Sequence, residues 1–160
     1  MKKNNYAGSI VLGLNDAIVE LTGVLAGLTL ALQNSSIIVI SALITGIAAS
    51  LSMAASSYLH AEEEKNHKEP FQSAIHTGST YLITVIFLIA PYFIFSNVYY
   101  ALATTLIIAI LIIAVYNYSI STQKQSFSKR FFKMTLISLS VALVTFIIGY
   151  LIRIYFGIEI

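Results

Sequence analysis

Residues 13–27 read GLNDAIVELTGVLAG, and they lie within a long apolar segment that covers residues 9–32. This segment is long enough to cross a bilayer, yet it carries two carboxylic acids, Asp16 and Glu20. Acidic side chains within the hydrocarbon of a membrane are costly and rarely occur there without a function. The stretch therefore predicts a membrane helix with one polar face of special importance.

The two acids share their face with three glycines. In a helix that turns about 100° per residue, they fall together in one stripe about 80° wide, which comprises Gly13, Asp16, Glu20, Gly23 and Gly27. Gly23 and Gly27 have the G-x-x-x-G spacing that allows close helix packing in membranes. A stripe of acids and glycines is unsuited to face lipid, so it predicts a packing seam, an ion path, or both.

The composition places the whole chain in a membrane. Of its 160 residues, 58% are hydrophobic and only 10% are charged, with a mean hydropathy of +0.84. Soluble domains carry about 25% charged residues. The expected fold class is an all-α integral membrane protein with a single transmembrane domain over residues 1–160. Cysteine is absent, which excludes disulfides and thiolate metal ligands.

Five transmembrane helices are expected, because five apolar segments each reach the roughly 20 residues that a span requires. They cover residues 9–32, 37–60, 72–95, 98–118 and 131–156. The second is expected to continue beyond the membrane to about residue 67, before Pro70 ends it.

Basic residues set the expected orientation. With the N-terminus in the cytoplasm and the C-terminus outside, Arg153 alone is external, and the internal basic residues are Lys2, Lys3, Lys65, Lys68, Lys124, Lys129, Arg130 and Lys133. This distribution follows the positive-inside rule.

The second segment also carries a polar face, which comprises Gly46, Ala49, Met53, Ser57, His60, Glu64 and, if the helix continues, His67. Met53 is seven residues in from His60, and Asp16 is seven residues in from Ser9. Each is thus about 10 Å deep from the same side. Gly46 is expected to serve helix packing or dimer contact, as are Gly13, Gly23 and Gly27.

Carboxylate and imidazole ligands suit divalent Fe, Mn or Zn, and a thioether disfavours Ca and Mg. The expected metal ligands are Asp16, Glu20, Met53, His60, Glu64 and His67. A carboxyl group in low-dielectric surroundings can exchange a proton for a metal ion, so Asp16 and Glu20 are also the expected proton-coupling residues. Alternatives remain open: the acids can form a structural pair, Met53 can fill the core, and residues 62–64 can be a solvated helix end.

A polar stripe in the third segment includes Ser73, His76, Thr77, Thr80 and Thr84. With Ser57, the residues His76 and Thr80 are expected to line a path for ions. The alternative is that the hydroxyl groups bond to the backbone of their own helix.

Two stretches, GLNDAIVELTGVLAGL at 13–28 and AASLSMAASSYLHAEEE at 48–64, resemble the vacuolar iron transporter family. The resemblance implies a homodimer that moves Fe²⁺ or Mn²⁺ out of the cytoplasm in exchange for protons, along a path between the protomers. Asp16 and Met53 match the family's functional aspartate and methionine. The long cytoplasmic domain of many members is missing, and Ser57 stands where they often have glutamate; Glu20 supplies a second acid.

The leading hypothesis is therefore a secondary transporter rather than an enzyme, with no permanently bound cofactor and no nucleic-acid partner. Its expected cargo is Fe²⁺ or Mn²⁺, with Zn²⁺ or Co²⁺ as further candidates. The expected location is the prokaryotic plasma membrane, or a vacuolar-type membrane in a eukaryote. Two alternatives remain: a non-transporting dimeric membrane module and a small proton-coupled exporter of organic cations.

Overall fold

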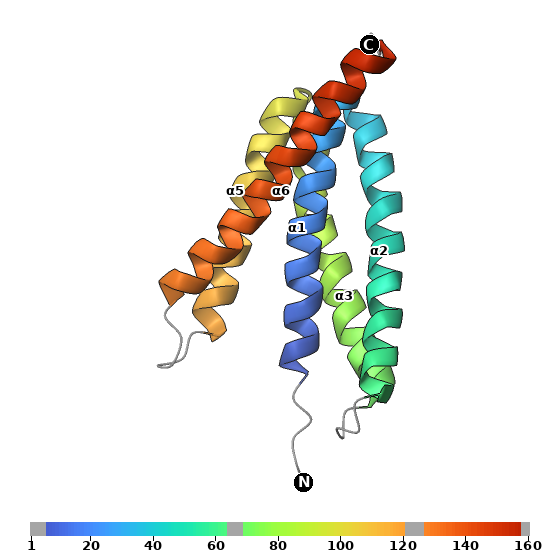
Figure 1. The fold of residues 1–160 in the computed structure, drawn as a ribbon, viewed down its shortest axis with the longest axis vertical. Helices are drawn as coiled ribbons and strands as arrows, with labels where there is room; N and C mark the ends of the chain where they lie inside the picture. The colour runs from blue at the N-terminus through green and yellow to red at the C-terminus, as the bar shows by residue number, and fades with distance from the viewer. Residues whose placement is uncertain (1–5, 64–68, 121–126, 158–160) are drawn as a thin grey trace.

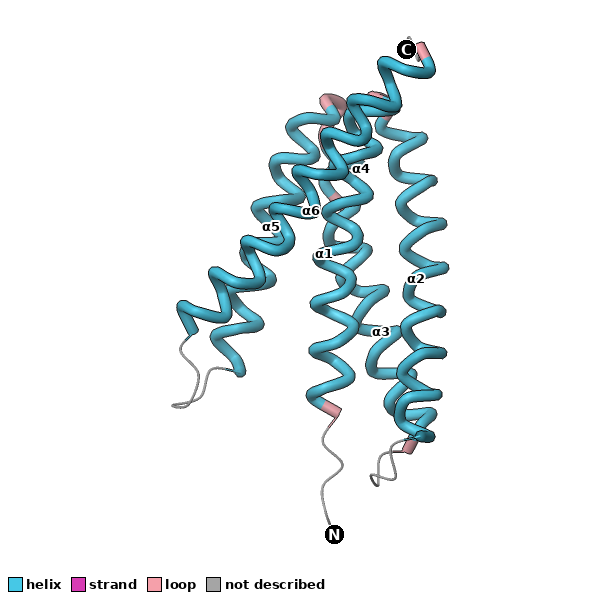
Figure 2. The backbone as a smooth tube through the Cα atoms, in the orientation of Figure 1, coloured by secondary structure: helices cyan, strands magenta, loops and turns pink. Residues whose placement is uncertain are grey.

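The computed structural model describes residues 6–63, 69–120 and 127–157, and within them all regular structure is helical (Figure 1, Figure 2). The helices are α1 (Ala7–Leu32), α2 (Ser35–Glu63), α3 (Pro70–Ile89), α4 (Pro91–Ile94), α5 (Val98–Ile120) and α6 (Phe127–Phe156). Five stretches of these residues are long and apolar enough to cross a membrane, with α3 and α4 counted as one. This confirms the expected all-α class and its five membrane-length helices, while the orientation stays a prediction.

The helix ends follow local backbone chemistry. At the end of α1, Gln33 adopts the left-handed conformation with φ 48°, and α2 starts two residues later. The Oδ1 atom of Asn34 accepts a hydrogen bond from the backbone N–H of Ile37, which caps the first turn of α2. The expected extension of this helix reaches Glu63, and the part expected over 64–67 lies outside the described residues.

The third predicted segment, 72–95, is divided in the structure. α3 ends at Ile89 and the short α4 runs from Pro91 to Ile94. Proline has no backbone N–H, so Pro91 cannot continue the hydrogen-bond ladder of α3. Pro70–Ile94 forms one membrane-length unit, as expected, and the helix within it is interrupted at Ala90, directly before Pro91.

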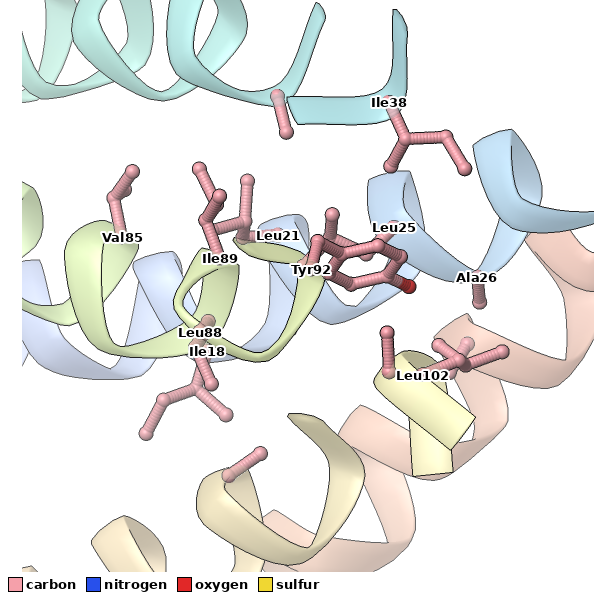
Figure 3. Close-up of a cluster of buried hydrophobic side chains, with 14 of the residues drawn as sticks. Ile18, Leu21, Leu25, Ala26, Ile38, Val85, Leu88, Ile89, Tyr92 and Leu102 are labelled. Carbon is pink, nitrogen blue, oxygen red and sulfur yellow. The ribbon is translucent and has the colours of Figure 1, made fainter. Parts of the chain in front are cut away.

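α1 lies at the centre of the bundle, with α6 crossing it on one side and α2 and α3 on another (Figure 1). Its fully buried residues Ile18, Leu21 and Leu25 belong to one apolar cluster with residues of α2 and α3 (Figure 3). By contrast, α5 and α6 carry many exposed large hydrophobic side chains, such as Leu111 and Val115. This is the distribution expected of helices that face lipid.

Glycine positions permit the closest helix contacts. At Gly13, an added Cβ would collide with the backbone of Thr77 on α3, and at Gly46 it would meet the Val85 side chain, also on α3. Gly27 approaches the backbone of Thr145 on α6. In lipid, where apolar burial drives helix association little, such close packing is a main source of stability.

Candidate polar site along the central helix

The side chain of Glu20 on α1 is exposed, but one of its carboxyl oxygens accepts a hydrogen bond from a buried residue. The hydroxyl of Tyr81, a fully buried residue of α3, donates a hydrogen bond to Oε2 of Glu20 over 2.7 Å. Tyr81 is not among the residues predicted from the sequence. The sequence does contain an indication of its role, because a tyrosine in the middle of an apolar helix needs a polar partner for its hydroxyl.

Asp16 is half-buried one helical turn from Glu20. It lies in a surface hollow of about 370 Å³, together with Asn15, Leu12 and Val19 of the same helix. Among the described residues, no hydrogen bond or ion pair to the Asp16 carboxyl group is found. Asn15 next to it has a buried Oδ1 atom without a partner in this part of the chain. The carboxyl group of Asp16 thus lies in a surface hollow without a protein partner in the described part of the chain, and its role as a ligand stays a prediction.

Met53 and Asp16 are each two helical turns from a residue that lines one cavity. A cavity of about 220 Å³ brings Ser9 and Leu12 of α1 together with Ser57 and His60 of α2. From Ser9 to Asp16 and from His60 to Met53 is seven residues in each helix, which corresponds to about 10 Å. Met53 is half-buried and packs against the apolar core, so the alternative of a core filler remains open.

Ser57 belongs to a buried cluster of hydroxyl groups that joins three helices. Its Oγ lies 2.8 Å from Oγ of Ser73, which is in turn 2.8 Å from Oγ of Ser9. Thr77 donates to Oγ of Ser57 over 2.8 Å and lies 3.2 Å from the Ser9 carbonyl oxygen. The cluster ties α1, α2 and α3 together beside the cavity that contains His60.

The residues of the polar stripe expected in the third segment make different contacts. The Nδ1 atom of His76 lies 2.7 Å from the Gln72 carbonyl oxygen, and its ring stacks on Tyr6 with centroids 4.7 Å apart. Thr84 donates to the carbonyl oxygen of Thr80, as the alternative of bonding within the helix predicted. Thr80 is half-buried.

The expected metal ligands that the structure describes do not converge into a complete site within one protomer. Across residues 6–63, 69–120 and 127–157, no three His, Cys, Asp or Glu side chains lie close enough to hold one metal ion. Glu64 and His67 lie outside the described residues. Asp16, Glu20, Met53 and His60 instead follow α1 and α2 at different depths, so their role as ligands stays a prediction.

The four glycines expected in helix packing or dimer contact all approach helices of their own chain. Gly13 and Gly46 face α3, and Gly23 and Gly27 face α6. A part for any of them in a dimer contact stays a prediction.

The sequence matches the model of one protein family. The family model described as the VIT family matches residues 7–69 and residues 60–150, which together cover most of the chain. Among curated proteins, none matches this sequence. The family match confirms the resemblance drawn from residues 13–28 and 48–64.

Proposed function

This chain belongs to the VIT family, and we propose on that basis that it exports Fe²⁺ or Mn²⁺ from the cytoplasm in exchange for protons. Family membership makes the chain a membrane metal-ion transporter rather than an enzyme. The direction of transport, the coupling to protons and the path are the parts that we propose.

The observation that carries this proposal is the environment of Asp16. Its carboxyl group lies within a membrane-length helix, half-buried, with no protein partner among the described residues. A carboxylate in this setting is costly unless it is protonated or bound to a cation. Asp16 thus has two favourable states, one with a proton and one with a metal ion.

Exchange between these two states is the proposed coupling. On the cytoplasmic side, a metal ion binds Asp16 and its proton leaves. On the outer side, the metal ion dissociates and the carboxylate takes up a proton before the site returns. Glu20 lies about 6 Å deeper along α1 and supplies a second carboxylate for the same cycle.

A second copy of the chain is proposed to complete the ligand set. One protomer offers at most the carboxyl group of Asp16 and the thioether of Met53, which is too few ligands for a divalent ion. A two-fold axis beside α1 doubles each contribution. Two carboxylates and two thioethers form a set that favours Fe²⁺ or Mn²⁺ over Ca²⁺ and Mg²⁺, with Zn²⁺ or Co²⁺ as further candidates.

We place the N-terminal end of the bundle in the cytoplasm, as the basic residues indicate. The cavity between Ser9, Ser57 and His60 then lies in the cytoplasmic half of the protein, and it shares Gly8 and Leu12 with the hollow that contains Asp16. The proposed location is the plasma membrane of a prokaryotic cell.

Metal uptake by proteoliposomes tests this function. Fe²⁺, Mn²⁺, Zn²⁺ and Co²⁺ are added separately, while an internal dye reports the pH. We expect metal flux accompanied by an opposite proton flux, and its loss in Asp16→Asn although that variant stays folded. Normal flux in Asp16→Asn overturns the assignment of Asp16, and no flux of any metal in the wild type favours a non-transporting membrane module.

A further inference from the structure

A groove of about 430 Å³ lies where α6 crosses α1, in the half of the bundle that holds the C-terminus (Figure 1). This volume is within the range of small-molecule sites in proteins. Its walls are almost entirely apolar, with Val24 and Leu28 from α1 and Ile148 and Ile152 from α6. Thr145 also lines the groove, but its hydroxyl donates to carbonyl oxygens of its own helix.

Glycines create the space at this crossing. Gly23 and Gly27 of α1 and Gly149 of α6 all line the groove. Because they have no side chains, the two helices approach closely there, and the larger side chains on either side form the walls. The groove is thus a feature of the helix crossing itself and does not depend on a mobile loop.

Among the residues that the structure describes, Glu20 is the only charged one that lines the groove. Its Oε2 atom accepts the hydrogen bond of Tyr81, and no described residue bonds to Oε1. No basic side chain of the described ranges forms an ion pair with it. A single carboxylate beside apolar walls complements a ligand that has one positive charge and an apolar body, and it disfavours anionic lipids.

We propose that this groove binds a lipophilic monocation, with its charged centre beside Glu20 and its apolar groups against Val24, Leu28 and Ile148. The ligand class is that of hydrophobic quaternary ammonium or phosphonium ions. This site is separate from the hollow at Asp16, which shares no residue with the groove. Glu20 is also the second carboxylate of the proposed transport cycle, but binding of a monocation to the groove is measured without metal flux.

Binding of tetraphenylphosphonium to the purified full chain in detergent tests the proposal. Isothermal titration calorimetry should give saturable binding to the wild type. Glu20→Gln removes the charge and should weaken binding at least about tenfold, a factor that corresponds to one modest ion pair. Val24→Phe fills the groove and should weaken binding to a similar extent while it retains Glu20.

Two controls make the result specific. Val115→Phe adds the same bulk on the exposed face of α5, where Val115 is 67% exposed, and should bind like the wild type. Asp16→Asn should also retain binding, even though it is expected to lose metal flux, so failure of this inference and failure of the transport function are distinguishable. Each variant is first checked as a single symmetric peak in size-exclusion chromatography.

The proposal is overturned if the wild type shows no saturable binding. It is also overturned if Glu20→Gln and Val24→Phe both bind as the wild type does, or if Val115→Phe loses binding to the same extent as Val24→Phe. Should Glu20→Gln fail to fold, the comparison of Val24→Phe with Val115→Phe decides the question alone.

Discussion

The hydroxyl of Tyr81 on α3 and the Oε2 atom of Glu20 on α1 are joined by a hydrogen bond of 2.7 Å. Tyr81 is fully buried, whereas Glu20 is exposed. The carboxyl group of Glu20 is therefore held from the interior of the bundle through one of its oxygens. As a consequence, α3 sets the direction in which an acid of α1 points, although the two residues lie 61 positions apart.

Tyr81→Phe removes this hydrogen bond and keeps the aromatic ring. We expect the free energy of unfolding to fall by about 1.5 to 3 kcal/mol, as for loss of a hydrogen bond to a charged group. Metal flux should fall several-fold, because the carboxylate of Glu20 is no longer oriented. Thermal unfolding in detergent and liposome flux assays measure the two effects. Tyr100→Phe is the control, since Tyr100 is 67% exposed; equal stability and flux in both variants would show that the bond to Glu20 has no role.

Much of the fold was predictable because membrane-length apolar segments leave a strong signal in the sequence. Residues 98–118 and 131–156 were expected as helices, and the structure has helices at Val98–Ile120 and Phe127–Phe156. The division of the third segment was not expected, although Pro91 is visible in the sequence. A proline near a helix end can be accommodated by a bend or cause a break, and tertiary contacts determine which occurs.

Helical periodicity predicted which residues of α1 share a face but not what that face contacts. The stripe of acids and glycines is predicted to be a packing seam, an ion path, or both. In the structure Gly13 packs against α3, whereas Gly23 and Gly27 pack against α6. The helix that contacts the stripe changes along α1 because the neighbouring helices cross α1 at an angle. That angle cannot be predicted from a single sequence.

The hydroxyl cluster of Ser9, Ser57, Ser73 and Thr77 could not be derived for a similar reason. Each residue is ordinary within its own helix, and only the packing of α1, α2 and α3 brings them within hydrogen-bond distance. Ser57 was expected to line a path. The structure adds that it is 3% exposed and bonded to Ser73 and Thr77.

Met53 gives a test of metal selectivity. Met53→Leu keeps nearly the same volume and removes the thioether, so packing should change little. We expect Fe²⁺ flux to fall about tenfold relative to Mg²⁺ flux, because the loss of a soft ligand affects softer ions most. The measurement is the ratio of the two fluxes in proteoliposomes.

Met53→Ala separates packing from ligation at the same position. It should reduce the Fe²⁺ to Mg²⁺ ratio as Met53→Leu does, and it should also lower stability because Met53 packs against the apolar core. If Met53→Leu retains the wild-type ratio while Met53→Ala is merely less stable, Met53 is a core residue and not a ligand.

Gly149 gives a test of the crossing between α1 and α6. A Cβ at this position would collide with the backbone carbonyl group of Gly27. The backbone cannot move aside without separating the helices, so Gly149→Ala should lower the free energy of unfolding by about 1 to 3 kcal/mol. For a chain of this size, about 1 kcal/mol corresponds to roughly 2–4 °C in the midpoint of thermal unfolding. The expected decrease is therefore several degrees.

Gly23→Ala is the matched control at the same crossing. There the added Cβ would lie 2.9 Å from Cγ1 of Val141, an atom of a side chain. A side chain can adjust its rotamer, whereas the carbonyl group of Gly27 is fixed by the helix. Gly23→Ala should therefore lower the midpoint of thermal unfolding much less than Gly149→Ala. If the two substitutions lower the midpoint equally, contact with the Gly27 carbonyl group is no more costly than contact with the Val141 side chain. The close approach of α6 to Gly27 then does not limit how tightly the helices pack.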